Sequence, residues 1–227
     1  MREKVLKLDL NTWFHPTVDI QRSGKSDLYG FDGKPKFDVI MPGDLVHCDF
    51  GISYLTLNTD CQELAYVLKP GETDAPQFLK EALKQGNTVQ DALTDNFIKG
   101  RTGNETLKIA IKESKKLGLR PQIYTHPLGL YGHSAGTTFG MWDAQHGVPG
   151  SGEHPLYENT AYAIELNAKV YIDQWQKDIR IMLEEAGFFG TSGFRYVNGR
   201  QTNLILIGQK SKYLESVSYT HLRAHET

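Results

Sequence analysis

The sequence has few cysteines, because only Cys48 and Cys61 occur among its 227 residues. Two cysteines cannot form the disulfide framework of a small secreted protein or the ligand set of a zinc finger, and they suit a reducing compartment. Long apolar runs are also missing, since none approaches the roughly 18 residues that a membrane-spanning helix needs. The charged start, MREKVLKLDLNTW, does not fit a signal peptide. We therefore expect a cytoplasmic protein.

The sequence also lacks an excess of charge of one sign. Its 25 basic and 27 acidic residues leave a formal net charge of −2. A balanced charge provides no electrostatic footprint for nucleic acid or for an anionic membrane, so we expect neither partner. With 39% hydrophobic and 11% aromatic residues, the chain has enough apolar side chain to bury the core of a globular domain.

The first part of the chain predicts strands. Residues 1–40 mix short apolar stretches with glycine and proline, which is typical of a loop with an edge strand. Residues 44–52 and 60–68 are rich in β-branched and aromatic side chains, and we expect them to pair as antiparallel strands. Further β-type runs lie near 160–172, 178–189 and 203–208.

Two helices are predicted between these strands. Val89, Leu93 and Phe97 recur at helical spacing, and a second apolar stripe runs from Leu107 to Leu117, with Gly118 just past its end. Each helix offers one apolar stripe to a sheet. Strands, helices and strands in this order favour an α+β fold with a mostly antiparallel sheet.

The C-terminal stretch SVSYTHLRAHET looks foreign to this domain. It has no periodicity, and it resembles the translated adapter sequence that ends many metagenomic reading frames. We therefore divide the chain into a domain of residues 1–209 and a tail of residues 210–227 that we expect to be non-native. His221 and His225 are left out of the candidate site for this reason.

Asp49 and Asp60 are eleven residues apart in otherwise apolar, strand-like sequence. Burying such carboxylates without a counter-charge is unfavourable, which indicates a cation between them. If the two strands pair as a hairpin, both carboxylates can point to one face and chelate a metal ion. The alternative is a pair of turn-capping aspartates, which are common.

His126 and His133 are seven residues apart in the glycine-rich segment THPLGLYGHSAGTTFG. Imidazole is a frequent metal ligand, although a loop histidine is more often only a polar surface residue. Glu165 lies in AYAIELNAKVYI and Glu184 in IRIMLEEAGFF. Both segments are predicted strands in which few other residues are polar. An ion pair between Arg180 and Glu184 is the alternative explanation for the second glutamate.

Four segments, PGDLVHCDFG…TD, THPLGLYGH, AIELN and IRIMLEE, resemble in order and spacing the motifs of the pita-bread metallopeptidases of peptidase family M24. This group includes the Xaa-Pro aminopeptidases, the prolidases and the methionine aminopeptidases, and the resemblance runs from about Pro16 to Ile207. With WFHPTVDIQR before the first aspartate and GMWDAQ after the histidine loop, the chain is more similar to the Xaa-Pro branch. The resemblance implies a curved, mostly antiparallel sheet with helices on its outer face.

The resemblance also implies a set of functional residues. The five metal-ligand positions are then Asp49, Asp60, His126, Glu165 and Glu184. His133 falls on the substrate-facing histidine outside the metal shell. Glu165 would act as the proton shuttle, and His133 would stabilise the tetrahedral intermediate.

The chain departs from the family pattern at three places. Members of the aminopeptidase branch usually carry an N-terminal domain and further helices, so the domain of residues 1–209 is expected to be N-terminally incomplete. The segment SDLYGFDGKPKFDV lacks a further substrate-binding histidine found in typical members. Met182 and Leu183 interrupt the usual Arg-Ile-Glu motif, which leaves Glu184 or Glu185 as the last ligand, and strand alternation favours Glu184.

The resemblance implies an aminopeptidase with two divalent metal ions that releases the first residue from peptides with proline in second position. Mostly oxygen ligands favour Mn²⁺, with Zn²⁺ or Co²⁺ as alternatives. The implied partners are a peptide substrate and, in the full-length parent, a second copy in a homodimer. Two other functions stay open, a catalytically silent pita-bread binding module or inactive fragment and a metal-free creatinase-like hydrolase. Retention of all five ligand types argues against the silent module and the creatinase-like hydrolase, whereas an inactive fragment stays open.

Overall fold

The computed structural model describes residues 2–24 and 39–208. The predicted tail of residues 210–227 and most of the segment SDLYGFDGKPKFDV lie outside the described residues. No helix within the described ranges has the length and apolar character that crossing a membrane requires.

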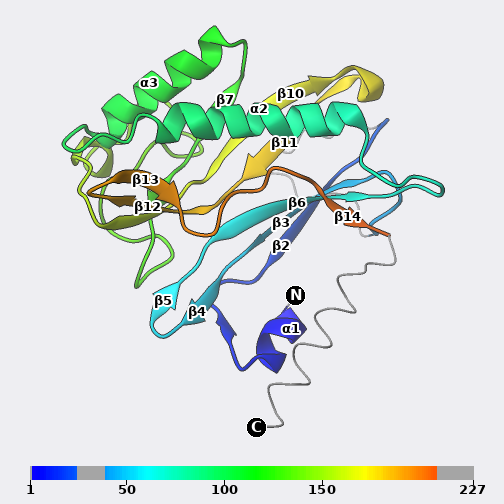
Figure 1. The fold of residues 1–227 in the computed structure, drawn as a ribbon, viewed down its shortest axis with the longest axis horizontal. Helices are drawn as coiled ribbons and strands as arrows, with labels where there is room; N and C mark the ends of the chain where they lie inside the picture. Colours follow the sequence, from blue (N-terminus) through cyan, green and yellow to red (C-terminus); the bar gives the residue numbers. More distant parts are fainter. Residues whose placement is uncertain (1, 25–38, 209–227) are drawn as a thin grey trace.

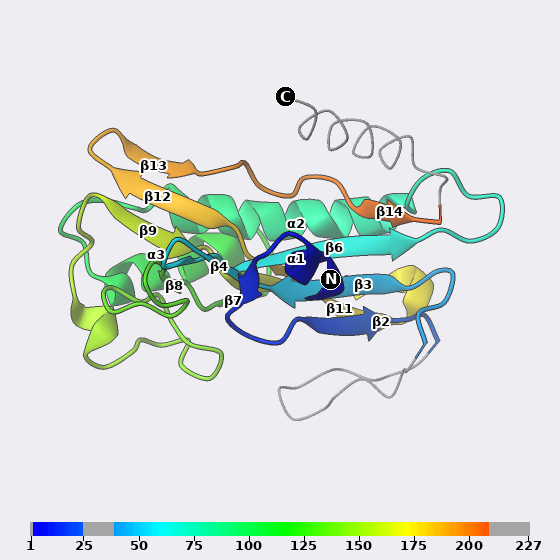
Figure 2. The same cartoon turned by 90° about the horizontal axis from the view of Figure 1, so that it is seen from below.

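The described strands form four small sheets that together make a curved β layer (Figures 1 and 2). Their orders are β1-β4-β5, β11-β10-β7, β13-β12-β9-β8 and β14-β6-β3-β2. Neighbouring strands pair antiparallel, except that β14 runs parallel to β6. The first strands are β1 (Asn11–Thr12), β2 (Thr17–Gln21), β3 (Leu45–Phe50), β4 (Ile52–Tyr54), β5 (Leu57–Asn58) and β6 (Cys61–Val67). The others are β7 (Pro121–Ile123), β8 (His126–Pro127), β9 (Thr160–Ala163), β10 (Leu166–Ile172), β11 (Lys177–Leu183), β12 (Ala186–Gly190), β13 (Gly193–Tyr196) and β14 (Ile205–Ile207).

Two antiparallel-packed helices, α2 (Gln77–Thr94) and α3 (Gly103–Lys116), cover one side of β7, β10 and β11 (Figure 1). Val89 and Leu93 of the predicted stripe are buried in the core, whereas Phe97 lies beyond the end of α2 and still packs into the core. Thr102 and Glu105 form a capping box that starts α3. Gly118 follows α3 with a φ of 75°, as a left-handed helix stop requires. The α+β prediction is therefore confirmed.

Gly86 brings α2 close to β11. A Cβ at this position would lie 2.6 Å from Ile181 Cγ2 and 2.9 Å from Leu183 Cδ1, so only glycine fits without a shift of the helix. Because β11 leads directly into Glu184, this contact also sets the distance between the helix and the residues of the candidate site.

We expect Gly86→Ala to destabilise the protein despite the better helix propensity of alanine. Overpacking costs about 1–3 kcal/mol, whereas the propensity gain is about 1 kcal/mol. The measurement is the free energy of unfolding from urea titrations. Lys84→Ala, on the exposed side of the same helix, is the control and should change stability little. A stability of Gly86→Ala equal to or above wild type would contradict the close packing.

The N-terminal segment differs from the predicted loop. It begins with a short helix, α1 (Arg2–Lys7), in which Val5 is buried. The predicted edge strand is present as β2, which lies at the edge of its sheet beside β3. Two 3₁₀ turns, at Ser151–Glu153 and Asp173–Trp175, complete the regular structure.

The two strands predicted at 160–172 and 178–189 are each broken in the middle. The first break falls at Ile164–Glu165, where the chain passes from β9 to the sheet of β10 and β11. The second falls at Glu184–Glu185, where it returns from β11 to the sheet of β9 and β12. The prediction of a continuous strand at Glu165 and Glu184 is therefore wrong. The backbone groups at the breaks still pair, since Ile164 N donates to Glu185 O and Gln62 N donates to Glu184 O. Both glutamates consequently lie where three sheets meet.

Candidate metal centre

The two aspartates approach each other through the pairing of β3 and β6. Asp49 lies opposite Gln62 in this antiparallel pair, and Asp60 immediately precedes β6. Because side chains two residues apart point to one face, Asp60 shares the face of Gln62 and therefore that of Asp49. Oxygen atoms of Asp49, Asp60 and Glu184 lie within 4.8 Å of one another. Asp60 and Glu184 are buried.

His126, at the start of β8, points its Nε2 atom into this carboxylate cluster. Nε2 lies 3.6 Å from Glu184 Oε1, 3.8 Å from Glu165 Oε2 and 3.9 Å from Asp60 Oδ2. On the other side of the ring, Nδ1 is 3.1 Å from the Pro127 carbonyl oxygen. That contact places the ring proton on Nδ1, so the lone pair of Nε2 faces the carboxylates. The structure thus brings all five predicted ligand side chains together.

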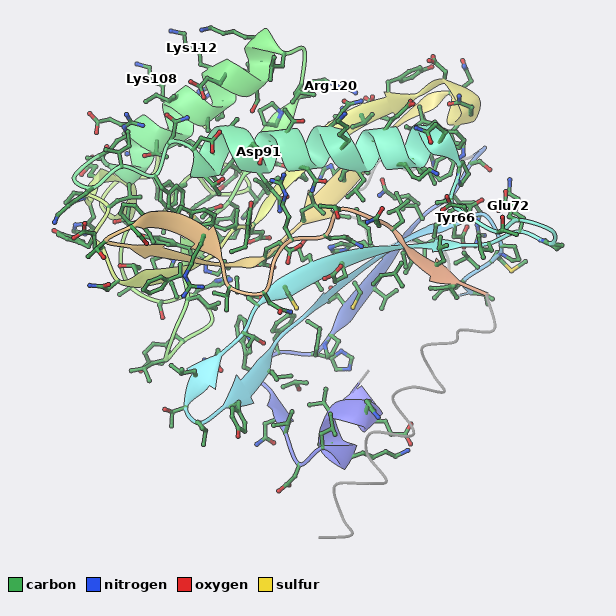
Figure 3. All side chains as sticks on the ribbon, viewed as in Figure 1. Tyr66, Glu72, Asp91, Lys108, Lys112 and Arg120 are labelled. Atoms are coloured by element: carbon green, nitrogen blue, oxygen red, sulfur yellow. The ribbon has the colours of Figure 1, made fainter. Side chains whose placement is uncertain are left out.

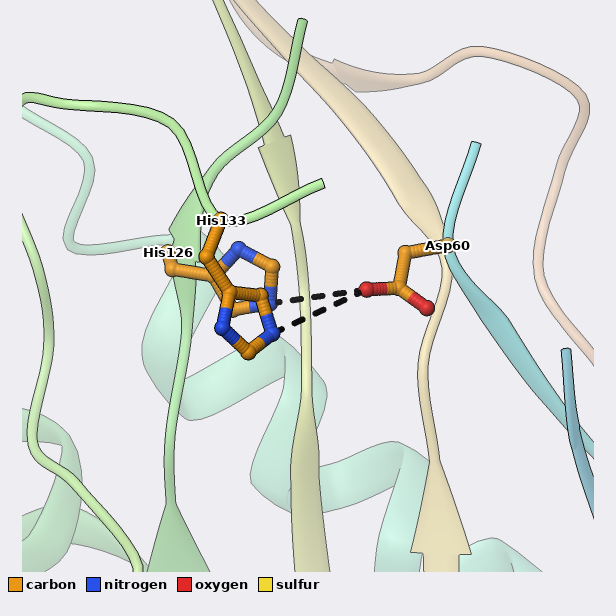
Figure 4. A group of neighbouring side chains, drawn as sticks. All are labelled: Asp60, His126 and His133. Atoms are coloured by element: carbon orange, nitrogen blue, oxygen red, sulfur yellow. Dashed lines mark ion pairs between the residues drawn. The ribbon is translucent and has the colours of Figure 1, made fainter. Parts of the chain in front are cut away.

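His133 lies beside His126 at the solvent side of the cluster (Figure 4). The centroids of the two imidazole rings are 4.2 Å apart, and His133 Nε2 is 4.0 Å from Asp60 Oδ2. Its side chain is 54% exposed, in contrast to 2% for His126. Nitrogen and oxygen atoms of Asp60, His126 and His133 could also hold an ion together. The assignment of His133 to a place outside the metal shell stays a prediction.

The cluster is electrostatically unfavourable by itself. Burial raises the pKa of Asp49 to about 6. Burial and then the charge of Asp49 raise the pKa of Asp60 to about 8. Burial and the charges of the other carboxylates raise the pKa of Glu184 well above its usual range, and the pKa of Glu165 rises to about 8. Burial lowers the pKa of His126 to about 4, which keeps its imidazole neutral. A cation in the middle would reverse the penalty on each carboxylate.

Three buried atoms of the cluster have no hydrogen-bond partner among the described residues. These atoms are Asp49 Oδ1, His126 Nε2 and Glu184 Oε1, and all three are electron-pair donors. Buried acceptors without a donor are rare in proteins, because each carries a desolvation penalty. Carboxylate oxygens with one imidazole nitrogen are ligands that Mn²⁺, Zn²⁺ and related divalent ions accept. The residues present therefore fit a metal centre.

Gln62 holds the two glutamates in place, and its role was not apparent from the sequence. Its Nε2 atom donates to Glu165 Oε1 at 3.0 Å and to Glu184 Oε2 at 2.9 Å. Its Oε1 atom is 2.8 Å from His47 Nε2, and His47 Nδ1 lies 3.4 Å from Asp19 Oδ2. A chain of polar contacts thus extends from the cluster to the edge strand β2. The only signal in the sequence is a glutamine two residues after Asp60 on the same strand face.

We expect Gln62→Leu to weaken metal binding by about 10–100-fold, the usual effect of losing a partner that orients metal ligands. Without the amide, Glu165 and Glu184 keep their charge but lose their orientation. The measurement is the dissociation constant for Mn²⁺ by isothermal titration calorimetry. Gln122→Leu, on β7, is the control because no hydrogen bond joins the Gln122 side chain to a predicted ligand among the described residues. Equal affinities for Gln62→Leu and wild type would contradict the orienting role.

Trp13 packs the His133 loop against the strand that follows Asp49. Its Nε1 atom donates to Thr59 O at 2.6 Å, and its ring lies edge-on to His133 with centroids 5.8 Å apart. A Cβ at Gly51 or Gly132 would come within 2.1 Å of this indole, so the close approach requires glycine at both positions. The motif WFHPTVDIQR, cited above only for its resemblance, therefore contains a residue that positions His133.

The choice between Glu184 and Glu185 follows from their surroundings. Glu184 points into the cluster, whereas Glu185 Oε1 accepts a hydrogen bond from Gln201 N at 2.6 Å, away from the other predicted ligands. Arg180 lies on the same face of β11 as Met182, but no ion pair joins it to Glu184 among residues 2–24 and 39–208. The ion-pair explanation for Glu184 is therefore wrong.

A curved α+β fold with a buried carboxylate and histidine cluster, set where antiparallel sheets meet, defines the pita-bread class of metallopeptidases. The model of metallopeptidase family M24 matches residues 7–189, and the chain belongs to this family. The predicted family and fold are thereby confirmed. A comparison with curated proteins finds no match.

Solved structures share the fold at low sequence identity. An X-Pro aminopeptidase from Thermotoga maritima is 20% identical with a TM-score of 0.61, over 86% of this chain and 50% of that chain. An Xaa-Pro dipeptidase from Bacillus anthracis is 20% identical with a TM-score of 0.59, over 86% and 49%. The N-terminal domain of FACT complex subunit SPT16 from Cicer arietinum is 11% identical with a TM-score of 0.61, over 90% and 50%. The chain thus spans about half the length of these structures.

Proposed function

We propose that this chain forms the catalytic part of an aminopeptidase with two divalent metal ions that releases the first residue from peptides with proline in second position. The observation that carries this proposal is the cluster of Asp49, Asp60, His126, Glu165 and Glu184. Three of its buried oxygen and nitrogen atoms have a lone pair but no hydrogen-bond partner among the described residues. The family match and the likeness to Xaa-Pro peptidases support it further.

Asp49, Asp60, His126, Glu165 and Glu184 would hold the two ions, since ligand atoms of these side chains gather in one cluster. Mn²⁺ suits a mostly oxygen ligand set, with Zn²⁺ or Co²⁺ as alternatives. When bound, such ions polarise a carbonyl oxygen and lower the pKa of water.

Glu165 would also move the proton. Its Oε1 atom accepts a hydrogen bond from Gln62, and the carboxylate would accept a proton from the attacking water and pass it to the leaving amine nitrogen. Burial raises the pKa of this carboxyl to about 8 in the absence of metal, and bound cations would lower it, so that the carboxylate can accept the proton. Burial lowers the pKa of His133, and its neutral imidazole would donate a ring N–H to the developing oxyanion.

The proposed partner is a peptide, and a homodimer is proposed for the full-length parent. On composition we propose a cytoplasmic location, with neither nucleic acid nor a membrane as a partner. The low cysteine content is the reason for the proposed location. The balanced charge is the reason for proposing neither nucleic acid nor a membrane as a partner.

The test combines metal analysis with peptide hydrolysis. The purified protein is dialysed against Mn²⁺, its metal content is measured, and release of the first residue from Ala-Pro-Ala is followed beside Ala-Ala-Ala. Two ions per chain and cleavage of the proline peptide alone are the expected results. Binding without any hydrolysis would favour the catalytically silent module, and absence of metal binding would overturn the ligand assignment.

A further inference from the structure

A polar track leads away from the metal cluster along β10 and β11. On β10 the buried residues alternate with partly exposed ones, so Asn167 and Lys169 point to the face that Glu165 occupies. On β11, Met182 and Arg180 likewise continue the face of Glu184. Because Lys169 pairs with Arg180 across the two strands, the track carries two neighbouring cations. Each lies four residues, or about 13 Å, from the nearest glutamate of the cluster.

Two cavities lie along this track and share wall residues. The first, of about 70 Å³, has Gln62, Glu165, Asn167 and Arg180 in its wall. The second, of about 360 Å³, also has Asn167 and Arg180 in its wall. The larger pocket therefore adjoins the cavity that Gln62 and Glu165 line.

The larger pocket has a strongly basic wall. Four cationic side chains line it, namely Lys115, Arg120, Lys169 and Arg180. Asp178 offsets part of this charge, because it binds Arg120 through both oxygens and lies 3.2 Å from Lys169. Among the described residues, Lys115 and Arg180 make no ion pair with any carboxylate. The pocket therefore holds more positive charge than its own residues neutralise.

We propose that this pocket is a subsite for a carboxylate at the far end of a short peptide. Lysine and arginine at one end of the track and the carboxylate cluster at the other make it complementary to a peptide with a free amino and a free carboxyl terminus. An extended chain advances about 3.3–3.6 Å per residue. A peptide of four or five residues therefore spans the distance when its first carbonyl lies at the cluster. The proposal rests on the proposed function, which places the scissile bond there.

The first test is binding without catalysis. Metal-free protein is titrated by calorimetry with Ala-Pro peptides extended by alanine to lengths of two to eight residues, each as free acid and as C-terminal amide. Amidation should weaken binding about tenfold at four and five residues and little at two or eight. The difference should shrink as NaCl is raised, because partly exposed charges are screened. An amidation effect that is the same at every length would overturn the subsite.

One further peptide distinguishes recognition of a C-terminal carboxylate from recognition of a side-chain carboxylate. Ala-Pro-Ala-Ala-Asp amide carries its carboxylate on a side chain at the fifth position instead of at the terminus. Recovery of the affinity lost by amidation supports recognition of a carboxylate from either source. Affinity as low as that of the alanine amide limits the subsite to a C-terminal carboxylate, which is still the proposed ligand.

Arg180→Gln tests the pocket itself, with Lys112→Gln as the matched control. Lys112 also carries one positive charge, but it projects from α3 away from the sheets (Figure 3) and does not line the pocket. We expect Arg180→Gln to abolish most of the acid-over-amide preference and Lys112→Gln to retain it. A purely structural role of Arg180 would weaken acid and amide peptides equally, and that result would overturn the proposal.

Hydrolysis by the Mn²⁺-loaded protein separates the two proposals. Cleavage of acids and amides at equal kcat/KM, at every length, overturns the carboxylate subsite and leaves the aminopeptidase function intact. Length-dependent preference for the free acids in binding, without cleavage of any peptide, overturns the aminopeptidase function and leaves the subsite intact.

Discussion

Asp60→Asn is expected to abolish both metal-dependent hydrolysis and binding of the metal pair. Asp60 is buried at the centre of the cluster, within reach of Asp49, His126 and Glu184. An amide has one oxygen and no charge, so it cannot supply the two anionic oxygens that a ligand shared between cations needs. The measurements are metal content after dialysis and the rate of alanine release from Ala-Pro-Ala. Wild-type activity in this variant would contradict the ligand assignment.

Thermal unfolding of the same variant distinguishes loss of ligation from loss of folding. Without metal, Asp60→Asn should melt at or above the wild-type temperature, because it removes one of four carboxylates whose pKa values burial raises. With Mn²⁺ added, the wild-type melting temperature should rise and that of the variant should not, since only a bound ligand stabilises the folded state. A metal-free variant that melts well below wild type would show that its inactivity reflects misfolding.

His133→Ala is expected to leave metal content nearly unchanged and to lower kcat by about 10²–10³-fold, the usual loss when an oxyanion donor is removed. His133 is more exposed than His126, and the five other side chains already provide a ligand set for two ions. The measurements are metal content and kcat for Ala-Pro-Ala.

The closeness of His133 to Asp60 makes this a discriminating experiment. If the substitution released one ion per chain, His133 would belong to the metal shell. His146→Ala is the matched control, because His146 lies after the same glycine-rich segment but in none of the groups that could hold an ion. It should change neither metal content nor kcat.

The residue types of the site were readable from the sequence because of their chemistry. Carboxylates in apolar segments require a counter-charge, which singles out Asp49, Asp60, Glu165 and Glu184, but their assignment as metal ligands followed from the resemblance to the family motifs. The β3–β6 pairing was predictable for a similar reason, since both runs are β-branched and close in sequence. Gln62 was not predictable, because an amide in a strand has no obligatory partner until the fold brings two glutamates beside it.

The strand breaks at Glu165 and Glu184 show where local sequence is insufficient. AIELN and LEEAG continue the apolar strand pattern, and no glycine or proline marks a stop between residues 160 and 185. The chain bends there because it passes between sheets, and the freed backbone groups find partners on segments far along the chain, such as Gln62 and Tyr124. Those partners exist only in the folded protein.

The sequence by itself determined the fold class and the helix stop at Gly118, because propensity and periodicity belong to short segments, and its resemblance to the family motifs predicted the set of donor side chains. Only the tertiary structure decided which glutamate faces inward, that His126 presents a bare Nε2 atom to the carboxylates, and that Lys115, Arg120, Lys169 and Arg180 share one pocket. These features depend on distances between residues remote in the chain, which packing of α2 and α3 on the sheets sets and no local pattern encodes.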